Sequence, residues 1–112
     1  MAKLQKRRIL KLMADYGAWP LWDSEAPEYN IDPNTLPISE DTKRRLLTWA
    51  DVYDATLNQE YPPSSAFKSQ EMERAFRREG SLLIQQLRSE LGSDYEIVGV
   101  KRQIEPDVPE ET

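Results

Sequence analysis

Carboxylates and aromatic rings are the side chains of this sequence that could take part in chemistry, and both gather in one segment. Residues 12–42 contain seven acids and no base. Two carboxylates in different environments can serve as general acid and general base, but any acidic loop offers such pairs and no spacing here singles one out. The acids are Asp15, Asp23, Glu25, Glu28, Asp32, Glu40 and Asp41, and Tyr16, Trp19, Trp22 and Tyr29 lie among them.

The stretch NIDPNTLPISED has part of the spacing of a calcium-binding loop, with Asn30, Asp32 and Asn34 at its first, third and fifth positions. The glycine that such a loop needs at its sixth position is Thr35, and Asp41 stands where a bidentate Glu is expected. Turns in which Asp precedes proline explain the pattern better. We therefore expect no metal and no cofactor.

The sequence contains no cysteine and no histidine. This composition excludes disulfides, thiolate metal sites and nucleophiles activated by histidine. We therefore predict that the protein is not an enzyme.

Basic residues occur as two KRR runs, at 6–8 and 43–45, and as Arg74, Arg77 and Arg78. They could suggest a nucleic-acid surface, but the chain has a net charge of −5 and its acidic block would repel phosphate. No nucleic-acid-binding motif is present either. We expect no nucleic-acid partner.

At 112 residues the chain has the length of one domain. Its longest apolar runs are too short for a membrane span, and Lys11 interrupts any signal-peptide core, which predicts a cytoplasmic protein without a membrane partner. The last ten residues, QIEPDVPEET, contain two prolines and four acids but no base. We predict a single compact domain over residues 1–102 and a disordered acidic tail over 103–112.

Capping residues predict two long helices. Ser39 is a good N-cap and is followed by two acids, so a helix should begin there and end near Asn58. Ser69 can cap a second helix that runs to about Leu91, with Gly92 placed for a C-cap.

Each predicted helix has one apolar face. The face of the second helix includes Gly80, which would let a neighbouring segment approach closely. The apolar positions are Leu46, Trp49, Ala50, Tyr53 and Leu57 in the first helix and Met72, Phe76, Leu83, Leu87 and Leu91 in the second.

Strands are predicted near both ends of the chain. Residues 7–13 favour a strand, although a short helix also fits their spacing, and residues 95–101 are rich in β-branched side chains. Breakers throughout residues 14–38 predict a long loop. The fold class is therefore α+β, with two long helices packed on a small two-stranded sheet of the N- and C-terminal strands, and with a long acidic aromatic loop.

The aromatic residues of the acidic loop could seal it onto the core, or one or two of them could stay at the surface beside the acids. We expect the tryptophans to anchor the loop and the acids to recognise a basic partner. The predicted partner-binding residues are Asp15, Tyr16, Trp19, Trp22, Asp23, Glu25, Glu28, Tyr29 and Asp32.

Three stretches, MADYGAWPLWD, LPISEDTKRRLLTWADVYDATLN and ELGSDYEIV, carry a resemblance. In this order they resemble small bacterial immunity-type proteins that are encoded beside secreted or contact-dependent growth inhibition toxins, over about residues 9–100. The resemblance implies a protein that binds and blocks a cognate bacterial toxin. The acidic surface favours a nuclease as this toxin, because the positively charged nucleic-acid cleft of a nuclease would attract it. An alternative is a non-catalytic adaptor or regulatory module of a bacterial assembly. The oligomeric state is left open.

Overall fold

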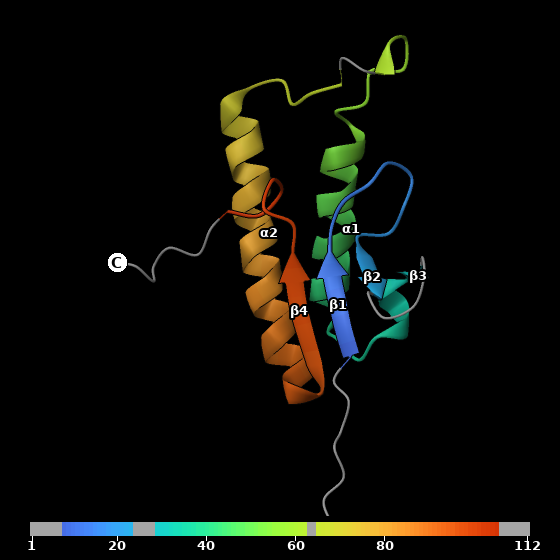
Figure 1. The fold of residues 1–112 in the computed structure, drawn as a ribbon, viewed down its shortest axis with the longest axis vertical. Helices are drawn as coiled ribbons and strands as arrows, with labels where there is room; N and C mark the ends of the chain where they lie inside the picture. The colour runs from blue at the N-terminus through green and yellow to red at the C-terminus, as the bar shows by residue number, and fades with distance from the viewer. Residues whose placement is uncertain (1–7, 24–28, 63–64, 106–112) are drawn as a thin grey trace, which may run out of the picture.

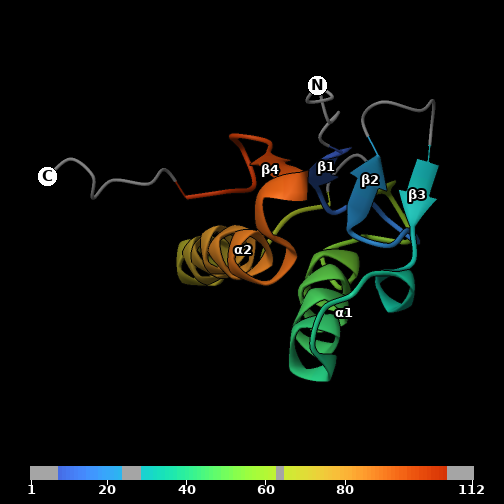
Figure 2. The same ribbon diagram turned by 90° about the horizontal axis from the view of Figure 1, so that it is seen from below.

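The computed structural model describes residues 8–23, 29–62 and 65–105. In these ranges it shows two helices packed against one face of a four-stranded sheet (Figure 1). Figure 2 shows both helices beneath the sheet, with α2 under β4 and α1 under β1 and β2. The elements are β1 (Arg8–Leu12), β2 (Leu21–Asp23), β3 (Tyr29–Ile31), η1 (Pro33–Thr35), α1 (Glu40–Asp54), α2 (Gln70–Leu91), η3 (Gly92–Asp94) and β4 (Tyr95–Gly99).

The predicted pairing of the two end strands is confirmed. β1 and β4 lie side by side in parallel, with Leu10 opposite Ile97. A parallel pair needs a long crossover, which the helices provide. Leu10, Leu12 and Ile97 are fully buried, and they form the centre of the core between sheet and helices.

The predicted two-stranded sheet is wrong, because the sheet has four strands in the order β3-β2-β1-β4. The two additional strands form an antiparallel hairpin within the segment that was predicted to be a loop. Each has only three residues, which is too short for alternating hydrophobicity to reveal. Pro20 directly precedes β2 and Pro33 follows β3, so these prolines bound the strands instead of preventing them.

Helix α1 begins as predicted but ends four residues earlier. The Ser39 hydroxyl accepts a hydrogen bond from the Thr42 amide at 3.1 Å, as an N-cap should. At the other end, both the amide and the hydroxyl of Thr56 donate to the Tyr53 carbonyl, at 2.9 and 2.7 Å. These short-range bonds replace the regular helical pattern and end α1 at Asp54.

Helix α2 confirms the predicted bounds, with Ser69 as N-cap and Gly92 at a φ of 75° as C-cap. Phe76, Leu83 and Leu87 are buried as predicted, but Met72 is 47% exposed. Met72 lies in the first turn of α2, which extends past the end of the sheet (Figure 1), so its predicted place in the core is wrong.

Trp49 joins the two helices. Its indole lies parallel to the Phe76 ring at a centroid distance of 4.4 Å, and its Nε1 donates to the Phe76 carbonyl oxygen at 2.8 Å. Gly80 lies beside this pair, where a Cβ atom would stand 3.0 Å from Trp49 Cζ2. The predicted close approach at Gly80 is therefore confirmed.

Residues 103–105, here called the C-terminal clasp, pack against the sheet, α2 and the segment that follows β1. Gln103 is buried, and its amide group accepts from Ala14 N at 2.7 Å and donates to Ala14 O at 3.0 Å. Ile104 enters a notch between Gly80 and Gly99, whose Cβ atoms would stand 2.7 and 2.6 Å from it. Residues 103–105 thus pack against the folded body, and residues 106–112 lie outside the described ranges.

The N-terminus of α1 is tied to the end of α2 by Glu90. Its carboxylate accepts hydrogen bonds from the Ser39 amide at 2.6 Å, the Thr42 hydroxyl at 2.6 Å and the Gln86 amide at 2.7 Å. Partial burial by itself raises the pKa of this carboxyl, but the hydrogen bonds from Thr42, Gln86 and Ser39 outweigh it and lower the pKa from 4.5 to about 2.

Candidate partner-binding surface

Residues 13–20 connect β1 to β2 and carry the first of the predicted site residues. We call this connection the β1–β2 turn. The Met13 amide donates to the Pro20 carbonyl at 2.9 Å and closes its base, and the Ala18 amide donates to the Asp15 carbonyl at 3.1 Å. Gly17 has a φ of 73°, a conformation that favours glycine. The turn therefore holds the side chains of its neighbours in fixed directions.

Tyr16 anchors this turn to the end of α1. Its ring stacks on Tyr53 at a centroid distance of 4.6 Å, and its hydroxyl is hydrogen-bonded to the Thr56 hydroxyl at 2.7 Å. The pKa of Tyr53 is raised above its ordinary value, mainly by burial and further by the neighbouring Tyr16. On the other side of the turn, the Gly17 amide donates to Asp54 Oδ1 at 3.2 Å. Tyr16 thus acts mainly as an anchor.

Trp19 is held by its backbone while its side chain stays open to solvent. The Trp19 amide donates to Asn30 Oδ1 at 2.9 Å, and Asn30 Nδ2 donates back to the Trp19 carbonyl at 2.8 Å. The residue is 43% exposed. An aromatic side chain on a fixed backbone loses little freedom when a partner covers it, which suits a binding surface.

The other two aromatic site residues divide in the same way. Trp22 is half-buried, and its Nε1 donates to the Met13 carbonyl at 2.9 Å. Tyr29 is 57% exposed. Trp22 therefore anchors the hairpin, while Trp19 and Tyr29 remain at the surface.

The predicted acids that the structure describes differ in their surroundings. Asp15 is exposed in the turn, whereas Asp23 forms an ion pair with Arg8 at 3.3 Å and its side chain is only 11% exposed. Asp32 caps η1, because its carboxylate accepts from the Asn34 amide at 2.9 Å. The predicted site residues Glu25 and Glu28 lie outside the described ranges.

A hollow of about 420 Å³ lies between the turn and the outer face of α1. We call it the acidic hollow. Its two lining acids, Asp51 and Asp54, come from α1 and were not among the predicted partner-binding residues. Their spacing from Leu47, four and seven residues along one helix, was the signal that they share a face with an exposed apolar residue. The lining residues are Gly17, Ala18, Trp19, Asn30, Leu47, Ala50, Asp51 and Asp54.

On this surface an exposed indole and the half-exposed Leu47 lie beside two carboxylates, those of Asp51 and Asp54, that have no ion-pair partner in the described ranges. Among the described residues, no group of three or more acids is arranged to hold a metal ion. The helices in the described part of the chain are not long and apolar enough to cross a membrane.

In a comparison with protein-family models, residues 8–101 match the family described as Serratia CdiI immunity protein-like. The matched range includes all the strands and both long helices of the structure. No match was found among curated proteins.

Proposed function

This chain belongs to the Serratia CdiI immunity protein-like family, and from this membership we propose that it binds and neutralises a cognate contact-dependent growth inhibition toxin. The family match over residues 8–101 is the observation that carries the proposal. Neutralisation by binding requires no catalytic group, in keeping with a family of immunity proteins. We further propose that it acts in the cytoplasm.

We propose that the acidic hollow and the turn beside it form the toxin-binding surface. Trp19 and Leu47 would supply the apolar contact, and Asp15, Asp51 and Asp54 would surround it with negative charge. Asp54 already accepts a hydrogen bond from Gly17, so it also keeps the turn in place. Tyr29, which is exposed at the start of β3, is proposed as a further contact. Glu25 and Glu28, which lie outside the described ranges, stay proposed partner-binding residues on the sequence alone.

The charge of this surface supports a basic target. A nuclease domain binds polyanionic substrate through a positively charged cleft, and an acidic protein surface can occupy such a cleft. We propose that the toxin is a nuclease and that binding excludes nucleic acid from its cleft. Protection would then follow from steric and electrostatic blocking.

Protection of cells provides the first test. The toxin domain encoded beside this gene is expressed together with the parent protein, with the double variant Asp15→Lys/Asp51→Lys, or with Trp19→Ala. Asp23 is left unchanged because its replacement would break the ion pair with Arg8, and a loss of protection could then come from lower stability instead of weaker recognition. We expect both variants to lose most of the protection, since charge reversal repels a basic cleft and the truncation removes the apolar contact.

The matched control is Glu60→Lys/Glu96→Lys, which changes the net charge equally at exposed positions on other elements. It should protect like the parent. Equal protection by all variants, at equal protein levels, would place the toxin-binding surface elsewhere. If the parent itself neither binds nor protects against this toxin, the immunity function is wrong and an adaptor role becomes the better proposal.

A further inference from the structure

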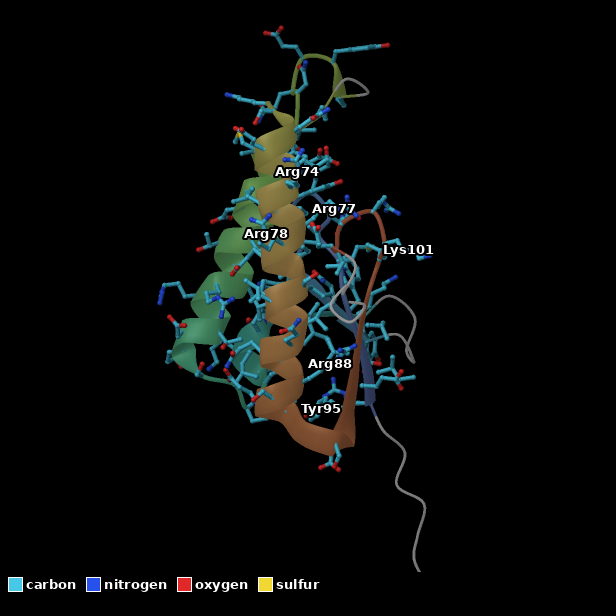
Figure 3. All side chains as sticks on the ribbon, turned by 90° about the vertical axis from the view of Figure 1, so that its left-hand side faces the viewer. Arg74, Arg77, Arg78, Arg88, Tyr95 and Lys101 are labelled. Carbon is cyan, nitrogen blue, oxygen red and sulfur yellow. The ribbon has the colours of Figure 1, made fainter. Side chains whose placement is uncertain are left out.

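A second surface, on the opposite side of the molecule from α1, has the reverse charge. Figure 3 shows arginines spaced along α2, with Lys101 on the turn that follows β4. A groove of about 470 Å³ separates this side of α2 from the end of β4 and the residues after it. We call it the basic groove. Its lining includes three cations, Arg77, Arg88 and Lys101, and one acid, Glu105.

Helical spacing explains why these groups share one face. Arg77, Ser81 and Arg88 stand at i, i+4 and i+11 along α2, so they project toward the same side. The turn after β4 brings Lys101 to the opposite wall. Ile84 and Val100 form the apolar floor between the two walls.

The arginines of the groove are held in place without being neutralised. Arg88 Nη2 donates to the Ile97 carbonyl at 3.0 Å, and Arg77 Nη2 donates to the Lys101 carbonyl at 3.3 Å. In the part of the chain that the structure describes, neither arginine has an ion-pair partner. Their positive charges are therefore both fixed and available, which lowers the entropy lost when an anion binds.

Arg77 also has an unused donor. Its Nε is buried and has no hydrogen-bond partner among the described residues, and the same is true of Oε1 of Glu105, the acid of the groove. A buried donor without a partner is unfavourable, so an acceptor that reaches it would be bound with advantage. A guanidinium with free donors suits a carboxylate, which can accept two parallel hydrogen bonds.

We propose that the basic groove binds an acidic polypeptide segment of a partner protein, with carboxylates at Arg77, Arg88 and Lys101 and an apolar side chain on Ile84 and Val100. This surface is separate from the acidic hollow, and the proposal does not depend on the identity of the toxin. A nucleic acid fits less well, because its continuous phosphate charge would extend onto a molecule whose net charge is −5.

Titration with a synthetic peptide tests the groove. The probe is a ten-residue peptide of alternating Glu and Val, added to the isotope-labelled full chain and followed by backbone amide NMR shifts. We expect the shifts to concentrate at Ser81, Gln85 and Val100. The double variant Arg88→Gln/Lys101→Gln should bind about tenfold more weakly, since two charge-assisted contacts are lost.

The control Lys68→Gln/Arg78→Gln removes one lysine and one arginine that do not line the groove, and it should bind like the parent. If both double variants bind the peptide equally weakly, the loss follows from net charge alone and the proposal is overturned. Shifts outside the groove, or tighter binding of an oligothymidylate than of the peptide, would also overturn it. Thermal unfolding of each variant shows whether the fold is retained, and Lys101→Glu, which leaves Arg88 in place, repeats the test.

Discussion

Gly80 and Gly99 have no side chain, and this leaves the space that the Ile104 side chain fills. Both face Ile104, at distances that leave no room for a Cβ atom. We predict that Gly80→Ala destabilises the protein by roughly 1–3 kcal/mol, as overpacking of a filled site does. Chemical denaturation of parent and variant measures this change.

A second substitution separates crowding from helix propensity. In an Ile104→Ala background the contact at 2.7 Å is gone, although Trp49 Cζ2 and Gln103 O would still stand 3.0 and 3.1 Å from the added Cβ atom, so Gly80→Ala should destabilise less there. If Gly80→Ala has the same effect in both backgrounds, or stabilises the parent as a better helix former, the notch described here does not limit packing.

Single residues differ in how far the sequence could predict them. Trp19 and Trp22 are three positions apart in one segment, and both could have been core or surface. The choice depends on Asn30, which fixes the Trp19 backbone, and on the Met13 carbonyl, which accepts from the Trp22 indole. Gln103 could not be predicted to be buried, because its partner Ala14 lies 89 residues away in the chain.

At the scale of elements, Glu90 makes the packing of α1 on α2 dependent on pH. The hydrogen bonds that hold its pKa at about 2 stabilise the folded state only while the carboxylate is ionised. Because the folded pKa lies below the ordinary value of 4.5, this stabilisation is complete above that value and is lost as the pH falls toward 2. Acid should therefore weaken the contact between the two helices.

The matched variant is Glu90→Gln, which keeps the shape of the side chain without its titration. We expect it to lower the free energy of unfolding near neutral pH by about 1 kcal/mol, since solvent screens part of the charge. The difference between parent and variant should shrink as the pH falls to about 3, in denaturation curves at each pH. A difference that stays constant or grows toward acid would contradict the role of the ionised carboxylate.

Elements with strong local signals were predicted well and short ones were not. α2 has an N-cap, a C-cap and a long apolar face within its own sequence, so its bounds could be derived. β2 and β3 have three residues each; β2 pairs with the edge of β1, and β3 pairs with the edge that β2 then offers. Such strands depend on tertiary contacts, which local patterns do not contain.

At the scale of the whole molecule, the C-terminal clasp joins β4, α2 and the turn of the candidate surface. We predict that a chain ending at residue 105 keeps its melting temperature, whereas a chain ending at residue 102 is destabilised by at least about 2 kcal/mol, because it loses the buried Gln103 hydrogen bonds and the Ile104 packing. Thermal unfolding of both truncations against the full chain decides this. Equal melting of all three would mean that the clasp adds nothing to stability.

Charge is divided between two sides of the fold, although the net charge of −5 does not reveal it. The acidic hollow lies between the β1–β2 turn and α1, and the basic groove lies between α2 and the end of β4. The acidic block was visible in the sequence. The shared helix face of Asp51 and Asp54 could also be derived from their spacing. Their place beside the β1–β2 turn, and the gathering of Arg77, Arg88 and Lys101, depend on packing between distant segments and became visible only in the fold.

The central claim is that the acidic hollow recognises a basic toxin domain, and association kinetics test it most directly. The association rate constant of the toxin domain is measured for the parent and for Asp15→Lys/Asp51→Lys at low and high ionic strength. We predict that the variant associates at least about tenfold more slowly at low salt and that the two rates converge at high salt, as for electrostatically steered binding. Equal rate constants at low salt for two correctly folded proteins would contradict the claim.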